Sequence, residues 1–201
     1  MKVNYTIFFL LVTATCIISC SKKENKIENE ELITQEEEEI TDPLYSRLNE
    51  ESSLDDYWEV FREDAIRSGR LDPGLNKSIT LFFGNEPDFA SGVTADHAGR
   101  AYSVCRDDEV SFEIIKSYWE DYTIVQRLYV FYHEAGHARY NYRHPCEFNE
   151  VCSINTDDLP IMWAAAFAGN NNNFEEFIKD KSNFFARKWE GIRYFHCTEN
   201  K

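Results

Sequence analysis

The sequence is poor in positive charge, with 21 Lys and Arg residues against 36 Asp and Glu residues and a formal net charge of −15. Binding of nucleic acids needs a basic surface against the phosphates, so this deficit argues against DNA or RNA as a partner. The chain also lacks any CxxC spacing, which argues against a cysteine-based structural zinc site. No internal repeat is visible, and 201 residues predict one domain of ordinary size.

Long apolar runs are also scarce, and the run at the N-terminus, "VNYTIFFLLVTATCIIS" after Lys2, is too short for a typical membrane-spanning helix. It ends in "IISC", which resembles the lipobox of bacterial lipoproteins. This resemblance implies that residues 1–19 are a signal peptide and that Cys20 becomes the lipidated first residue of the mature chain. Ser21 after it implies the outer membrane of the cell envelope. The alternatives are a plain secretory signal or an uncleaved anchor.

The segment after Cys20 lacks the apolar residues needed for a core. Residues 21–40, "SKKENKIENEELITQEEEEI", contain eight Glu, three Lys and no aromatic residue. Such a composition cannot bury enough surface to offset its chain entropy. We therefore expect residues 20–50 to be an acidic disordered tether, and residues 51–201 to form the folded domain.

Four cysteines are left for that domain once Cys16 in the signal and Cys20 are set aside, and exported chains keep disulfides. Four cysteines allow three pairings. In one of these pairings, Cys146 and Cys152 close a small loop and Cys105 is tied to Cys197 near the C-terminus.

The domain has the pattern of a mixed α+β fold. A helix is predicted from Ser53 to Gly69, and its apolar face consists of Leu54, Tyr57, Trp58, Phe61, Ala65 and Ile66. Residues 78–84 predict a buried strand, 85–102 a loop and 110–115 a second strand. A long helix is predicted from Thr123, its N-cap, to residue 140, and residues 173–195 predict further helix.

The long helix contains "HEAGH", in which His133 and His137 are four residues apart. A helix advances about 100° per residue, so both imidazoles project from nearly the same face and can bind one ion. Glu134 points to the side, where it can reach a water on the metal. Zinc lowers the pKa of such a water towards ~7, and Glu134 is the expected catalytic base.

A catalytic zinc needs a third protein ligand, and His144 is the leading candidate. The chain must turn back after the helix to bring it to the ion. Asn141 suits this bend because asparagine tolerates a left-handed conformation, and Pro145 favours an extended His144. The competing ligands are Glu147, Glu150 and Asp157, or a glutamate on a later helix: Glu175, Glu176 or Glu190. His97 and His196 are interpreted as surface histidines, although His196 is a further candidate for the metal or the transition state.

The stretch "HEAGHARYNYRH" resembles the zincin metallopeptidases, and among them the metzincin side, which has HExxHxxGxxH followed by a methionine-containing turn. Here the third histidine is one residue later, and Tyr140 stands in place of the glycine. The spacing is more similar to zinc-dependent lipoproteins of Bacteroidota, in which an asparagine lies in the bend. The resemblance implies a zincin-like fold, Zn²⁺ as cofactor and a Met-turn at "LPIMW", with Met162 as its methionine.

The predicted function is therefore a zinc metallopeptidase that hydrolyses peptides or proteins at the cell envelope, as a lipid-anchored monomer. The alternative is a non-catalytic surface lipoprotein, a binding or adhesion module that retains a zincin-like fold.

Overall fold

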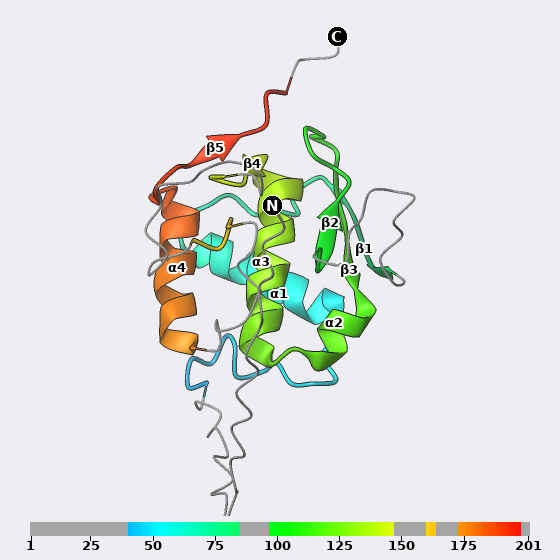
Figure 1. The fold of residues 1–201 in the computed structure, drawn as a ribbon, viewed down its shortest axis with the longest axis vertical. Coiled ribbons are helices and arrows are strands. Elements are labelled where there is room, and N and C mark those ends of the chain that lie inside the picture. Colours follow the sequence, from blue (N-terminus) through cyan, green and yellow to red (C-terminus); the bar gives the residue numbers. More distant parts are fainter. Residues whose placement is uncertain (1–39, 85–96, 147–159, 164–172, 198–201) are drawn as a thin grey trace, which may run out of the picture. The chain divides into compact units, whose positions relative to one another are not determined.

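The computed structural model describes residues 40–84, 97–146, 160–163 and 173–197. Within these ranges the chain is a mixed α/β structure with four helices, a three-stranded sheet and a two-stranded sheet, consistent with the predicted α+β class (Figure 1). The elements, in chain order, are α1 (Leu54–Arg67), β1 (Ser78–Gly84), β2 (Gly99–Ala101), β3 (Glu109–Ile115), α2 (Lys116–Asp121), α3 (Ile124–Tyr140), β4 (Tyr142–Arg143), α4 (Phe174–Ala186) and β5 (Arg193–Tyr194).

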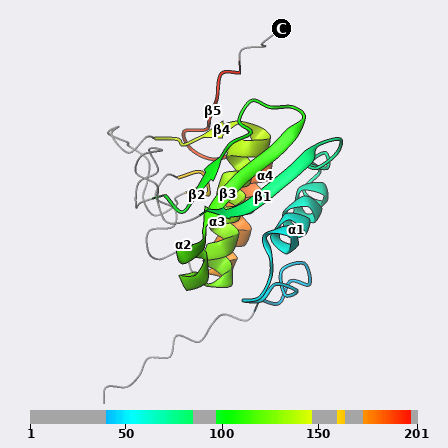
Figure 2. The same ribbon diagram turned by 90° about the vertical axis from the view of Figure 1, so that its right-hand side faces the viewer.

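Helix α3 is the central element, with the larger sheet on one side of it and α4 on another (Figures 1 and 2). The sheet has the order β1-β3-β2, in which β1 is parallel to β3 and β2 is antiparallel to it. Alternate residues of β3, namely Val110, Phe112 and Ile114, are fully buried. The ring of Phe112 meets that of Phe131 in α3 edge-on, with centroids 5.1 Å apart. The two-residue period of a strand thus aligns one face of β3 with the helix.

Burial of α3 extends around almost its whole circumference. Every residue from Arg127 to Ala138 is buried, including four that are polar or charged: Arg127, His133, Glu134 and His137. A helix that is buried on all sides lies in the centre of a domain. The polar residues of "HEAGH" are therefore interior residues, which need partners there.

Helix α1 begins as the sequence predicts. The Ser53 side chain accepts a hydrogen bond from the Asp56 backbone amide, and the Asp56 carboxylate accepts one from the Ser53 backbone amide, which completes a capping box. Gly69, with φ +75°, follows the C-terminal end of the helix. The predicted apolar face is wrong at one position, because Ile66 is 49% exposed.

The predicted buried strand at residues 78–84 forms, as β1, but it is not buried. It lies at the edge of the sheet, and Phe82 and Phe83 are 39% and 40% exposed. The apolar run "LFF" gave the pattern of a buried strand, although only one edge of β1 is paired. The predicted loop at 85–102 contains β2 at its end, and α2 follows β3 directly; neither element was expected.

The folded part of the chain begins before residue 51. Leu44, Tyr45 and Leu48 are buried, with at most 5% of each exposed. The placement of residues 40–50 in the tether is therefore corrected. The acidic residues that precede this segment suggested disorder, but its apolar side chains pack into the core. Residues 1–39 lie outside the described part, and with them Cys16 and Cys20.

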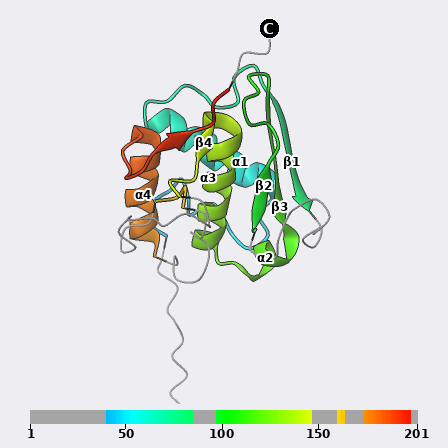
Figure 3. The same cartoon turned by 45° about the horizontal axis from the view of Figure 1, so that its top comes forward.

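The C-terminal part is only partly helical. Helix α4 begins at the N-cap Asn173 and ends at Arg187, whose left-handed conformation stops it. Residues 193–194 then form β5, where helix was predicted, and β5 pairs with β4 in antiparallel fashion (Figure 3). No helix of the described residues is long and apolar enough to cross a membrane.

Candidate metal centre

The first pair of histidines is placed by the start of α3. The side chain of Thr123 accepts a hydrogen bond from the Gln126 backbone amide, and the Gln126 side-chain oxygen accepts one from the Thr123 backbone amide. The helix therefore begins at the predicted residue. It then continues without interruption to Tyr140. His133 and His137 are therefore one turn apart on one face, and each is at most 9% exposed.

The third histidine is placed by a reversal of the chain. Asn141 has φ 55° and ψ 30°, the left-handed conformation expected at this position, and its amide donates to the Gly136 carbonyl. The chain then turns back as β4, and His144 follows it half-buried. The left-handed bend predicted at Asn141 is therefore present.

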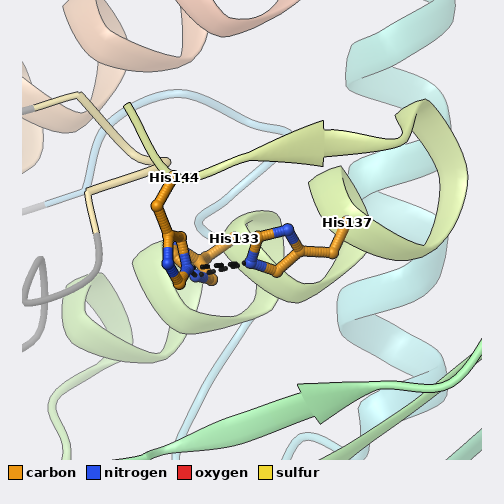
Figure 4. Close-up of side chains that lie close together, drawn as sticks. All are labelled: His133, His137 and His144. Atoms are coloured by element: carbon orange, nitrogen blue, oxygen red, sulfur yellow. Dashed lines mark hydrogen bonds between the residues drawn. The ribbon is translucent and has the colours of Figure 1, made fainter. Parts of the chain in front are cut away.

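The three imidazoles converge on one point. The Nε2 atoms of His133, His137 and His144 form a triangle in which each pair is 3.0 Å apart (Figure 4). The three side chains are close enough to bind one metal ion. Nitrogens at this spacing suit an ion at metal–nitrogen distances of about 2.1 Å, as zinc requires.

Hydrogen bonds fix the tautomers of the first two imidazoles in the form that a metal needs. His133 Nδ1 lies 2.7 Å from the Ile161 carbonyl oxygen, and His137 Nδ1 lies 2.6 Å from that of Tyr142. A carbonyl only accepts, so each Nδ1 carries the proton and each neutral ring presents an Nε2 lone pair. Two lone pairs that face each other at 3.0 Å repel unless a cation lies between them. The donor set therefore fits a metal ion.

Burial keeps the imidazole of His133 neutral. It lowers the pKa of His133 well below its ordinary value, and the neighbouring His137 and His144 lower it further. The metal-binding form of a histidine is the neutral one. Desolvation of the site thus favours the form in which a metal is bound.

Glu134 lies against strand β2 of the larger sheet. It is 4% exposed, and a side chain on Gly99 in β2 would come within 2.9 Å of its Oε1 atom. Burial raises the pKa of Glu134 to about 8, and the negative charge of Glu113 adds to the shift. A cation bound by the three histidines would favour the ionised carboxylate.

Met162 is part of a tight turn, in which the Trp163 amide donates to the Pro160 carbonyl at 2.8 Å. The methionine is fully buried, and its sulfur occupies the space next to Gly136 in α3. The preceding residue, Ile161, supplies the carbonyl that orients His133. The methionine-containing turn therefore supports the histidine pair through packing and a backbone hydrogen bond.

The other candidate ligands do not join this cluster within the described residues. His97 and His196 are exposed, as are the three glutamates proposed on later helices, Glu175, Glu176 and Glu190. Glu147, Glu150 and Asp157 lie outside the described residues, as does Cys152. Of the remaining cysteines, Cys105 and Cys197 form a disulfide with a Cα–Cα distance of 5.3 Å. Cys146 is also disulfide-bonded.

Sequence reasoning missed the groups that orient the site. The carbonyls of Ile161 and Tyr142 belong to the backbone, which every residue has, so the amino acids at these positions give no indication of the role. Gly99 does leave a signal in the sequence, because an isolated glycine next to a strand indicates a close approach of another group to the backbone.

A scan against protein-family models found no match, and searches of curated proteins and of solved structures found none.

Proposed function

We propose that this chain is a zinc-dependent hydrolase that cleaves peptide bonds. The observation that carries the proposal is the triangle of Nε2 atoms, in which the lone pairs of His133 and His137 face each other and a bound cation would relieve their repulsion. Three protein ligands with an open further position are typical of catalytic zinc, whereas structural zinc has four protein ligands. Neutral imidazoles also suit other transition metals, and zinc is proposed because the HExxH helix is typical of zinc hydrolases.

Glu134 is proposed as the general base. Bound zinc would supply a Lewis acid that lowers the pKa of water towards ~7 and polarises a carbonyl. Glu134 follows His133 on a rigid, fully packed helix, so its carboxylate stays close to the metal position. From there it can accept the proton of the attacking water and pass it to the leaving amine. Its burial excludes bulk water, which strengthens these electrostatic interactions.

Strand β2 is the proposed binding edge for the peptide. It is the last strand of the larger sheet, and no further strand pairs with it among the described residues. Gly99 in β2 lies directly against Glu134. An extended peptide that adds to this edge would pair with the backbone and pass the carboxylate.

The zincin identity and the location in the envelope belong to the same proposal. The spacing from His133 to His144 and the methionine-containing turn support a metzincin-like zincin. The lipobox at Cys20 supports a lipid anchor, with the outer membrane as the location and a monomer as the expected state. Incorporation of labelled palmitate into the wild-type chain, but not into Cys20→Ser, would test the anchor.

The function is tested with the purified full-length chain, its Glu134→Gln variant and a peptide library. We expect one equivalent of zinc in both proteins, and cleavage by the wild type only. The matched control is Glu120→Gln, because Glu120 is a 62% exposed glutamate of α2 that pairs with Lys116 at the surface. This control should cleave as the wild type does.

Two results would overturn the proposal in different ways. A wild-type chain that binds no divalent metal would rule out the metal centre. A chain that holds zinc and cleaves no peptide would favour the alternative, a non-catalytic surface lipoprotein with a zincin-like fold.

A further inference from the structure

The last strand of the described chain lies against the segment that carries His144. Strands β4 and β5 pair in the register Tyr142 with Tyr194 and Arg143 with Arg193. Figure 3 shows β5 crossing beside β4 at the end of α3. His144 is the residue directly after β4, so the pairing ends immediately before the third histidine.

The contacts with the C-terminal segment continue on both sides of His144. Before it, the Phe195 amide donates to the Asn141 carbonyl at 2.8 Å, and the guanidinium of Arg143 lies 5.6 Å from the centroid of the Phe195 ring. After it, Arg193 donates to the Pro145 carbonyl at 3.5 Å. The Phe195 ring also approaches that of His137, with centroids 5.9 Å apart.

This segment is in turn tied to the loop between β2 and β3. Cys197 forms a disulfide with Cys105, 92 residues earlier in the sequence. The Cys105 amide donates to the side-chain oxygen of Asn141 at 2.7 Å. Asn141 thus contacts both segments that the disulfide joins: its side chain accepts a hydrogen bond from the Cys105 amide, and its carbonyl accepts one from the Phe195 amide. A glycine in the bend could adopt the same backbone conformation, but it could not accept the hydrogen bond from Cys105.

We propose that residues 193–197, held by the Cys105–Cys197 disulfide and by Asn141, are a positioning device for the third metal ligand. The segment makes zinc affinity depend on a covalent bond that lies outside the metal centre. This inference rests on the proposed metal centre and assigns a role to residues that the HExxH pattern does not include. Without the disulfide, the segment is held on β4 by the two paired residues and by the hydrogen bonds of Arg193 and Phe195, and the return segment becomes less rigid. Zinc binding then has to order His144, and the free energy that this ordering costs weakens zinc affinity.

The test measures zinc affinity by competition with a chromophoric chelator. The full-length wild type is compared with the double variant Cys105→Ser/Cys197→Ser and with Asn141→Gly. Loss of groups that orient metal ligands typically weakens binding about 10- to 100-fold, and we expect the double variant to fall in this range. Asn141→Gly, which keeps the bend but loses the side-chain acceptor, should show a smaller loss. Asn141→Asp keeps an acceptor oxygen and should restore affinity towards that of the wild type.

Two further measurements separate positioning from a general loss of stability. Amide hydrogen exchange of the metal-free proteins should accelerate at residues 141–145 in the double variant, and its Co²⁺ complex should show an altered visible spectrum. The control is Leu48→Ala, a truncation of a buried residue in the segment before α1. It should be destabilised and still bind zinc as the wild type does.

Each outcome decides the question. A double variant that binds zinc as tightly as the wild type overturns the positioning role and leaves the metal centre intact. An equal loss of affinity in Leu48→Ala also overturns it, because the effect would then be one of global stability. A wild type without zinc overturns the metal centre itself, and the positioning role with it.

Discussion

The side chain of Glu134 fills the space that a side chain at position 99 would need. A Cβ atom on Gly99 would lie 2.7 Å from Glu134 Cγ and 2.9 Å from the Glu113 carbonyl oxygen. Real Cβ atoms do not make such contacts, and the backbone of β3 cannot give way. The glycine of β2 is therefore what allows the carboxylate to lie between helix and sheet.

Substitution Gly99→Ala should displace Glu134 and leave the histidines in place. We expect peptide cleavage to fall at least about 100-fold, since a misplacement of about 1 Å at a reacting group has this effect. Zinc affinity should change little, because the atoms nearest to the new Cβ belong to Glu134 and Glu113 and not to the histidines. Steady-state kinetics and zinc titration of the same preparation measure the two effects separately.

The matched control is Gly74→Ala. A Cβ atom there would have its nearest neighbour at 3.4 Å, an ordinary contact, and Gly74 lies outside the site. This variant should cleave and bind zinc normally. If Gly99→Ala also cleaved normally, the close approach of β2 to Glu134 would have no functional role.

The histidine helix and its bend were predictable because short-range chemistry determines both. Thr123 caps α3 and Asn141 takes the left-handed conformation; each preference belongs to one residue and its neighbours. Chemical type alone, however, did not decide between His144 and the glutamates as third partner. The structure brings His144 to the pair.

Elements that depend on distant contacts were not predictable. Strand β5 exists because it pairs with β4, about 50 residues away, and Phe82 is exposed because β1 is an edge strand. Tyr45 is buried although an acidic run precedes it, because it packs edge-on against Phe174 and Phe177 of α4. Local composition carries no signal for such pairings.

Gly136→Ala should destabilise the chain and weaken metal binding. In an exposed helix this change stabilises by roughly 0.5–1 kcal/mol, but here the new Cβ would lie 2.5 Å from the Met162 sulfur. The turn that contains Ile161 must then move away from His133. We expect the free energy of unfolding to fall by about 1–3 kcal/mol, as for overpacked cores. Urea denaturation measures this change.

A second substitution tests that mechanism. Met162→Ala removes the sulfur, so the double variant Gly136→Ala/Met162→Ala should be less destabilised than the sum of the single changes. Additive losses would mean that the clash with Met162 is not the cause.

The metal-free protein should lose stability as the pH rises towards 8. The pKa of Glu134 is about 8 in the folded chain and lies near 4.5 in the unfolded chain, so between these values the folded state binds more protons. The stabilisation from the protonated carboxyl is present in full below pH 4.5 and disappears as the pH rises through 8. Its slope is at most about 1.4 kcal/mol per pH unit.

The comparison that isolates this effect is with Glu134→Gln, in the presence of a chelator. Histidines contribute equally to both proteins, so the difference in their free energies of unfolding reports Glu134 alone. We expect the wild type to become less stable relative to the variant from pH 5 to pH 8. A difference that is constant with pH would contradict the raised pKa.

Asp64 should be more important to stability than its partly exposed neighbour Glu63. Asp64 is 1% exposed, accepts from the hydroxyls of Tyr45 and Tyr132, and pairs with Lys181 at 2.5 Å. Asp64→Ala leaves Lys181 without its buried counter-charge, so we expect a loss of about 3–5 kcal/mol in urea denaturation. Glu63→Ala, which breaks only surface ion pairs, should cost less than about 1 kcal/mol. Equal losses would show that the buried hydrogen bonds and ion pair of Asp64 contribute no more to stability than the surface ion pairs of Glu63.

The start of the folded chain can be tested by truncation, because residues 40–50 supply part of the core. A chain that begins at residue 51 lacks the side chains of Leu44, Tyr45 and Leu48, each of which is buried. Burial of one such side chain contributes about 1.5–3 kcal/mol, and the sum approaches the whole stability of an ordinary domain. Removal of residue 50 also takes away the carbonyl that accepts from buried Arg127 at 2.9 Å.

We therefore expect the chain that begins at residue 51 to lack a cooperative thermal transition, while the chain that begins at residue 40 melts as the full-length protein does. Differential scanning calorimetry distinguishes the two. Equal melting temperatures would contradict the structural role of residues 40–50, and would restore residue 51 as the start of the domain. The predicted result instead limits any spacer between a lipidated Cys20 and the folded domain to the residues before 40.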